Sequence, residues 1–251
     1  MKNIGTKIID GQDEIWTLDM WDIRQQVYAR VAEIACWEQM DRETAAQQRE
    51  YAYACIQQLW DSCRDSYCMS ILLQPFEKDC VAAGEFCFAD EHIQCRILNQ
   101  IDRNQIQKGY LYALRVPEQN EESNAPQSLL QQYYVEAFQV ACMDVARAWM
   151  QDYLQKKHSV EKPCVCSPSF GPGYYGMKLE DVPKLVRILD AKRIGIEWAQ
   201  GAMNPQMSLV GVYLLSGHEL LQPGSDCEDC IGGSAGCDFC DKRRIQTPEN
   251  V

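Results

Sequence analysis

The chain lacks a long hydrophobic run. Its longest apolar stretch, around Met207 to Leu215, is far shorter than the roughly 20 residues that a helix needs to cross a bilayer. The N-terminal residues 1–7 also show no apolar segment after their lysines, although a secretory leader requires one. From these two absences we expect a soluble protein of the cytoplasm with no membrane partner.

Positive charge is scarce as well. The 251 residues include 24 lysines and arginines against 36 aspartates and glutamates, so the formal net charge at pH 7 is −12. A nucleic-acid-binding protein presents a basic footprint. The densest basic cluster here is Lys242-Arg243-Arg244, which we interpret as balancing the acidic segment beside it. The composition therefore argues against nucleic acid as a partner.

Histidine is rare, and familiar catalytic signatures are missing. The three histidines, His92, His158 and His218, do not stand at metal-ligand spacing from one another, so we expect surface or capping positions for them. His218 is an exception to watch, because it lies nine residues before a cysteine cluster. No nucleophile elbow, phosphate-binding loop or dinucleotide fingerprint occurs. The sequence names no catalytic residue.

Cysteine, in contrast, is abundant, with 14 residues. Four of them, Cys227, Cys230, Cys237 and Cys240, form two Cys-x2-Cys pairs separated by six residues. Two such thiolate pairs can surround one soft metal ion or cluster. Disulfides are the minor alternative. Structural zinc knuckles usually stand further apart, and the Gly-rich segment 231–236 can wrap a larger object, so we favour an iron–sulfur cluster over zinc.

The other ten cysteines show no framework spacing. Free cysteine behaves as a small buried hydrophobe, so we interpret Cys63, Cys68, Cys80 and Cys87 as core thiols rather than as a second cluster. If their segment is extended, Cys164 and Cys166 point to one face. A structural role for this pair is favoured over a redox role.

Hydrophobic periodicity predicts a mixture of helices and strands. The predicted helices are 20–38, 41–60 with Asp41 as its N-cap, 90–101 with Asp90 as its cap, 128–156 and 182–191. The predicted strands are 71–73, 86–89, 110–115, 194–197 and 207–215, and a turn is predicted at 202–206. Helices and short strands in this irregular order favour an α+β fold, in which long helices cover a largely antiparallel sheet.

Glycine and proline shape one further segment. Residues 164–176 contain three glycines and two prolines within nine positions, which predicts a tight backbone that can approach a ligand closely. The polar segment 117–127 is interpreted as a surface loop within one domain. We therefore predict an α+β domain over 1–218, followed by a cysteine-rich metal-binding tail over 219–251.

Two segments resemble a known family. Pro172-Gly173-Tyr174, followed by a helix, a short strand and then residues 202–213 with the form Ala-Met-x-Pro-x-x-Ser-x-x-Gly-x-Tyr, resembles the activation domain of cobalamin-dependent methionine synthase. The similarity is greatest to free-standing relatives of that domain, which often end in a cysteine-rich tail. The resemblance is specific over 167–215 and extends in element order over 1–160.

The resemblance implies a shallow groove for S-adenosylmethionine, whose methyl group is presented to a cobalt corrinoid. The groove residues that it implies are Ser169, Gly171, Pro172, Gly173, Tyr174, Ala202, Met203, Pro205, Ser208 and Tyr213. Two positions depart from the family. Ser169 replaces an arginine suited to a ligand carboxylate, and Trp198-Ala199-Gln200 replaces a Thr-Glu-Ser segment, although Glu197 is close by.

The functional expectation is an accessory protein for corrinoid-dependent methyl transfer. It would bind S-adenosylmethionine, a corrinoid protein or methyltransferase, or both, and support reductive methylation and reactivation of cobalt, with the cysteine cluster relaying electrons from a donor. The alternative is a non-catalytic module with a structural zinc site that docks on a corrinoid protein. The choice between an enzyme and a binding module stays open in the sequence.

Overall fold

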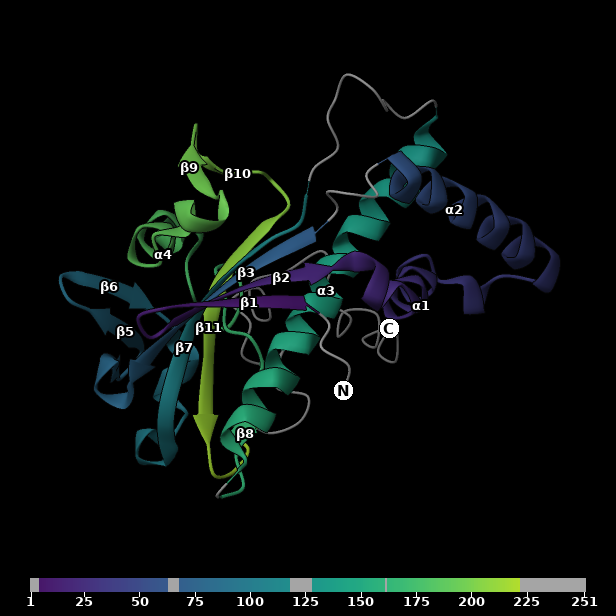
Figure 1. The fold of residues 1–251 in the computed structure, drawn as a ribbon. Helices are drawn as coiled ribbons and strands as arrows, with labels where there is room; N and C mark the ends of the chain where they lie inside the picture. The colour runs from purple at the N-terminus through teal and green to yellow at the C-terminus, as the bar shows by residue number, and fades with distance from the viewer. Residues whose placement is uncertain (1–4, 63–67, 118–127, 161, 222–251) are drawn as a thin grey trace, which may run out of the picture. The chain divides into compact units, whose positions relative to one another are not determined.

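A computed structural model describes residues 5–62, 68–117, 128–160 and 162–221 (Figure 1). The chain forms two compact units, each assembled from separate stretches. Unit 1 comprises Met1–Gln74, Tyr112–Met150 and Asp190–Leu209, and unit 2 comprises Pro75–Leu111, Gln151–Leu189 and Val210–Val251. The predicted domain boundary near residue 218 stays a prediction, since the tail beyond residue 221 lies outside the described residues.

The largest sheet has six strands in the order β1-β2-β3-β7-β11-β8. Their bounds are β1 Gly5–Asp10, β2 Asp13–Asp19, β3 Cys68–Glu77, β7 Ile106–Arg115, β8 Val165–Cys166 and β11 Ser208–Ser216. The β1–β2, β2–β3 and β8–β11 pairs are antiparallel. β7 and β11 are almost continuously buried, whereas β1 is exposed along most of its length. Their near-continuous apolar runs suit inner strands.

Two smaller sheets contain the other strands of the described residues. One has the order β4-β5-β6, with β4 Val81–Ala82, β5 Glu85–Phe88 and β6 Glu91–Gln94. The other pairs β9 Glu197–Ala199 with β10 Ala202–Asn204. All of these pairings are antiparallel.

The α-helices are α1 Arg24–Ile34, α2 Arg42–Ser62, α3 Leu129–His158 and α4 Val182–Ile188. Short 3₁₀ helices are η1 Met20–Ile23, η2 Trp37–Gln39, η3 Lys78–Cys80, η4 Arg96–Asn99, η5 Arg103–Gln105, η6 Leu179–Asp181 and η7 Ala191–Ile194. The predicted cap at Asp41 is confirmed, because its carboxylate accepts the N–H groups of Glu43 and Thr44. No helix in the described ranges is long and apolar enough to span a membrane.

The long helix α3 packs on strands within each unit. In unit 1 the Trp16 ring of β2 meets the Trp149 ring of α3 edge-on, with centroids 5.1 Å apart. In unit 2 the Tyr110 hydroxyl of β7 lies 2.9 Å from Nε2 of His158 at the end of α3. The buried part of the predicted apolar stripe of α3 consists of Tyr134, Ala137, Phe138 and Ala141. The α+β prediction with a largely antiparallel sheet is confirmed.

Three local predictions are wrong. Residues 90–101 form β6 and η4 instead of a helix, because β6 pairs with β5 across a two-residue turn in which Ala89 has φ +48°. Segment 194–197 is not a strand, since η7 ends at Gly195 with φ +74° and β9 begins only at Glu197. Part of the predicted turn 202–206 is strand β10.

Candidate functional site

The Pro172-Gly173-Tyr174 segment forms a loop that closes on its own backbone. The Tyr174 N–H donates to the Gly171 carbonyl at 3.0 Å, and the Met177 N–H donates to the Tyr174 carbonyl at 2.9 Å. The Gly173 N–H donates to the Met177 carbonyl, also at 2.9 Å. Gly173 has φ +92°, which side chains rarely permit. The loop therefore has one defined shape.

Buried contacts fix this loop to the start of η4. The Tyr175 carbonyl accepts the Ile97 N–H at 3.1 Å, and the Tyr175 ring meets the Phe170 ring edge-on at 5.0 Å. A Cβ at Gly176, where φ is +77°, would lie 2.5 Å from Cβ of Arg96. Only glycine fits at that position without a shift of the backbone.

The loop exposes one aromatic ring. Tyr174 is 63% exposed, and nearby Leu179 is 64% exposed. A flat, exposed ring with one hydroxyl can stack on a planar ligand. Ser169, in contrast, is buried, so the position of the family's arginine presents no charge at the surface of the loop.

Strand β11 runs beside the loop within unit 2. Phe170 and Val212 exchange two backbone hydrogen bonds, of 2.9 and 2.7 Å. A Cβ added at Gly171 would lie 3.4 Å from the Val210 carbonyl oxygen, which leaves little spare room. Tyr213 on the same strand is only 1% exposed. Its role as a groove residue stays a prediction.

Residues 202–209 of the second motif lie in β10 and at the start of β11, in unit 1. Residues 210–213 belong to unit 2. Ala202 and Met203 belong to β10, exposed and half-buried respectively, and Pro205 is buried after a cis peptide bond. Ser208 is 3% exposed, and its hydroxyl has no hydrogen-bond partner in the part of the protein that the structure describes. A buried polar atom without a partner calls for a water or a ligand.

Arg115 is a neighbour of this motif that the sequence analysis overlooked. Its Nε is also buried and has no partner among the described residues. The backbone N–H of Val116 donates to the Met207 carbonyl at 2.9 Å, so Arg115 and Ser208 lie on adjacent segments. Arg115 is the last residue of the predicted strand 110–115, and a charged residue at the end of an apolar strand is the signal that could have indicated it.

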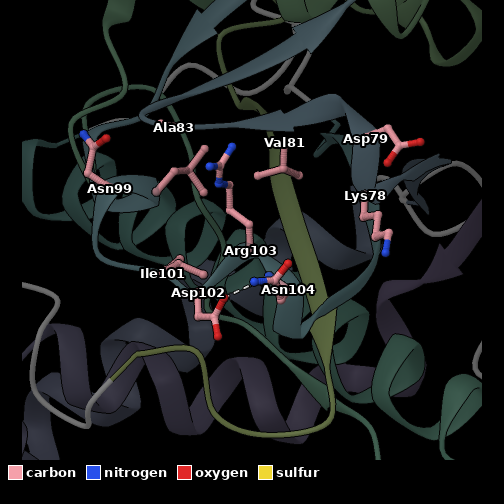
Figure 2. Close-up of a pocket in the computed structure, with 10 residues that line it drawn as sticks. Lys78, Asp79, Val81, Ala83, Asn99, Ile101, Asp102, Arg103 and Asn104 are labelled. Carbon is pink, nitrogen blue, oxygen red and sulfur yellow. Dashed lines mark hydrogen bonds between the residues drawn. The ribbon is translucent and has the colours of Figure 1, made fainter.

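A separate cavity of about 680 Å³ lies in unit 2 (Figure 2). It is lined by Lys78, Asp79, Val81, Ala83, Leu98, Asn99, Ile101, Asp102, Arg103 and Asn104. Charges of both signs line it, and the Asp102 carboxylate accepts the Asn104 N–H at 3.0 Å. None of the sequence-predicted site residues is among its lining. Three of the lining residues, Leu98, Asn99 and Ile101, lie in the segment 90–101 for which the helix prediction is wrong.

The cysteines divide into two groups. The predicted metal ligands Cys227, Cys230, Cys237 and Cys240 lie outside the described residues. Cys166 lies on β8 and Cys164 is the residue before β8, and both are buried. Burial raises the pKa of both thiols, to about 12 for Cys166. A thiol that stays protonated is a poor nucleophile, which favours the structural role for this pair.

One of three comparisons with known proteins found a similar protein, and the similarity concerns the fold. No family model matches the chain, and no curated protein matches its sequence. Among solved structures, the crystal structure of the MetH reactivation domain bound to AdoHcy is similar, with a TM-score of 0.54 and 12% sequence identity. The similarity covers 98% of this chain and 91% of that chain. The chain therefore has a fold similar to that of the MetH reactivation domain over nearly its whole length.

Proposed function

We propose that this protein is an accessory factor for corrinoid-dependent methyl transfer that binds S-adenosylmethionine or S-adenosylhomocysteine. The observation that carries the proposal is the near-complete fold similarity to a reactivation domain bound to AdoHcy. The Pro-Gly-Tyr loop supports it, because its glycines hold a fixed turn and Tyr174 offers an exposed ring. The corrinoid would be held by a partner protein or methyltransferase.

The ligand proposal is tested by calorimetry on Tyr174→Ala. Loss of the exposed ring should weaken S-adenosylhomocysteine binding about tenfold, the effect of about 1.4 kcal/mol. Leu179→Ala is the matched control, because its side chain is equally exposed but offers no ring. Gly173→Val is unsuitable, since φ +92° makes any side chain there strained and confuses binding with folding. Absence of binding by the unmodified protein at millimolar ligand would remove the proposal.

The cysteine-rich tail is proposed to carry an iron–sulfur cluster that relays electrons to Co(II). Acidic residues beside the thiolates, Asp229 and Asp238 among them, disfavour the addition of an electron and so lower the reduction potential. Cys230→Ser or Cys237→Ser should abolish metal uptake. Neutralising Asp229 and Asp238 together should raise the midpoint potential without loss of metal.

Anaerobic preparation distinguishes this relay from the alternative zinc module. A brown protein with broad visible absorbance supports the relay. A colourless protein with one zinc ion per chain supports a structural module that docks on a corrinoid protein without electron transfer. The ligand-binding test above is independent of this outcome, because the tail and the loop are probed by different variants.

A further inference from the structure

Three metal-binding side chains converge on one face of the β5–β6 hairpin. Cys87 pairs directly with His92 across the two strands, and Glu85 stands two residues before Cys87 on β5. Side chains two residues apart on a strand point to the same face, and directly opposite residues have Cβ atoms about 5 Å apart. The hairpin register therefore places a carboxylate, a thiol and an imidazole together on one face.

The distances between the three donor atoms fit a tetrahedral metal ion. Nδ1 of His92 lies 3.4 Å from Oε1 of Glu85, Sγ of Cys87 lies 3.6 Å from Nδ1 of His92, and Sγ lies 3.8 Å from Oε1. Bond lengths of about 2.0–2.3 Å around tetrahedral zinc imply donor separations of roughly 3.3–3.6 Å. A small inward movement of the thiol would complete the geometry.

Neighbouring residues hold the ligand-bearing strand in place. Nζ of Lys184 donates to the His92 carbonyl at 2.8 Å, and the guanidinium of Arg187 pairs with the Glu91 carboxylate at 2.6 Å. Both cations come from α4, so α4 contacts β6 at Glu91 and at His92. Fixed surroundings of this kind lower the cost of assembling a metal site.

The chemistry of the donors selects the ion. One thiolate, one imidazole and one carboxylate suit zinc or a neighbouring divalent transition metal and disfavour magnesium or calcium. The His92 and Glu85 side chains are 59% and 34% exposed, so an ion can enter from solvent. Three protein ligands leave one coordination position open.

We propose that Glu85, Cys87 and His92 form a second metal site, distinct from the cysteine-rich tail, which binds a zinc-type divalent ion and leaves one position for solvent or a ligand from another molecule. Without metal, the same groups satisfy one another by hydrogen bonds and an ion pair. The proposal does not depend on the function proposed above.

Cobalt substitution tests this site in the full-length chain. Replacing Cys227, Cys230, Cys237 and Cys240 by serine removes the tail ligands while keeping every residue of the hairpin. We expect this variant to bind about one Co(II) per chain with a thiolate-to-cobalt absorption band, and one zinc ion by elemental analysis. A reductant keeps the Cys87 thiol available as a ligand.

Further variants in this background make the test specific. Cys87→Ser should abolish the thiolate band, and Glu85→Gln and His92→Ala should each weaken binding at least about tenfold. Two control variants should leave metal binding unchanged. They are Gln94→Ala, on the same strand as His92, and Cys36→Ser, which removes an exposed thiol of unit 1. Circular dichroism of each variant checks that the fold is retained.

Two results would overturn the site. One is the absence of Co(II) and Zn(II) binding by the tail-serine variant at tenfold excess of metal while its circular dichroism matches that of the unmodified chain. The other is a thiolate band that persists in Cys87→Ser. If the tail-serine variant does not fold, the unmodified chain and its Cys87→Ser variant must differ by one metal ion per chain, and equal metal contents reject the proposal.

Discussion

At the scale of single residues, burial controls the chemistry of the cysteines. Cys95 and Cys166 are almost fully buried, and burial raises the pKa of each thiol from the ordinary 9 to about 12. Their thiolates are therefore rare at neutral pH. Among the described thiols, reactivity is expected at the exposed Cys36, where metal or alkylating reagents have access.

The raised pKa values predict a loss of stability at alkaline pH. Between about pH 9 and pH 12 the unfolded chain releases these protons while the folded chain retains them, so the contribution is present below pH 9 and is lost as pH rises. For each thiol, the free energy of unfolding should fall by about 1.4 kcal/mol per pH unit in this range. Urea unfolding of the reduced protein at several pH values measures it.

A double variant provides the control for this pH dependence. Cys95→Ala with Cys166→Ala removes both titrating groups, so its free energy of unfolding should fall less steeply above pH 9, even if its absolute stability is lower. Equal slopes for the two proteins would contradict the assignment, because other alkaline groups are common to both.

At the scale of elements, the β5–β6 hairpin brings together metal-binding side chains that no sequence motif indicates. Its two-residue turn, Ala89-Asp90, places alanine at φ +48°. A first turn residue with positive φ is normally glycine. Pairing with β4 and contacts of the α4 cations with β6 stabilise the hairpin. One face of the hairpin carries Glu85, Cys87 and His92.

Ala89→Gly should stabilise unit 2. The left-handed conformation costs alanine roughly 1–2 kcal/mol, and the added freedom of glycine in the unfolded chain costs about 0.4–1 kcal/mol, so a net gain of about 0.5 kcal/mol is expected. Ala82→Gly in β4, where φ is not positive, should instead lose about 0.5–1 kcal/mol. Chemical denaturation compares the two, and a loss in both would show that the turn is not strained.

At the scale of the whole molecule, distant parts of the chain meet within each unit. In unit 1 the guanidinium of Arg193 donates to the Asp13 carboxylate at 2.6 Å and to the Asp10 carboxylate at 3.0 Å. The Arg193 side chain is 21% exposed and that of Asp13 is 15% exposed. Hydrogen bonding to Asp13, the largest cause, raises the pKa of Arg193 further, so the cation is permanent.

Arg193→Ala should destabilise the protein by about 2 kcal/mol, because Asp13 is left mostly buried without its partner. Lys192→Ala is the matched control. Its ion pair with Glu197 is 3.3 Å long between largely exposed side chains, so we expect a change within about 0.5 kcal/mol. Thermal or urea unfolding distinguishes the two, and equal effects would show that the Asp10–Asp13–Arg193 contact contributes little.

The helices and inner strands were predictable from local patterns. Asp41 and Ser128 begin α2 and α3 as the capping rules anticipate, and the apolar runs around Leu72, Tyr112 and Val212 became strands. The β1–β2 hairpin was not predicted, although the sequence carries a signal for it. Gly11 stands first in its two-residue turn, with φ +64°, where glycine is preferred. The error at residues 90–101 arose because isoleucines at intervals of four fit a helix, whereas pairing with β5 selected a strand and a 3₁₀ turn.

The candidate sites were predictable only where the motif is local. The Pro-Gly-Tyr loop depends on two of its own glycines, because Gly173 and Gly176 have positive φ angles that glycine adopts at no steric cost. The orphaned groups of Arg115 and Ser208 and the cluster of Glu85, Cys87 and His92 depend on register. A shift of one residue in strand pairing would send these side chains to opposite faces.

By itself the sequence therefore determined the fold class, the long helices, the inner strands and the two family-like motifs, because hydrophobic period, capping and glycine act over a few neighbouring residues. The four tail cysteines are also a local pattern, and their metal stays a prediction. Only the tertiary structure decided which polar side chains are buried without partners, which thiols lose their acidity and which ligands face one another. Burial depends on residues far apart in the chain and on the low dielectric that their packing creates. The facing ligands of the β5–β6 hairpin depend on its strand register.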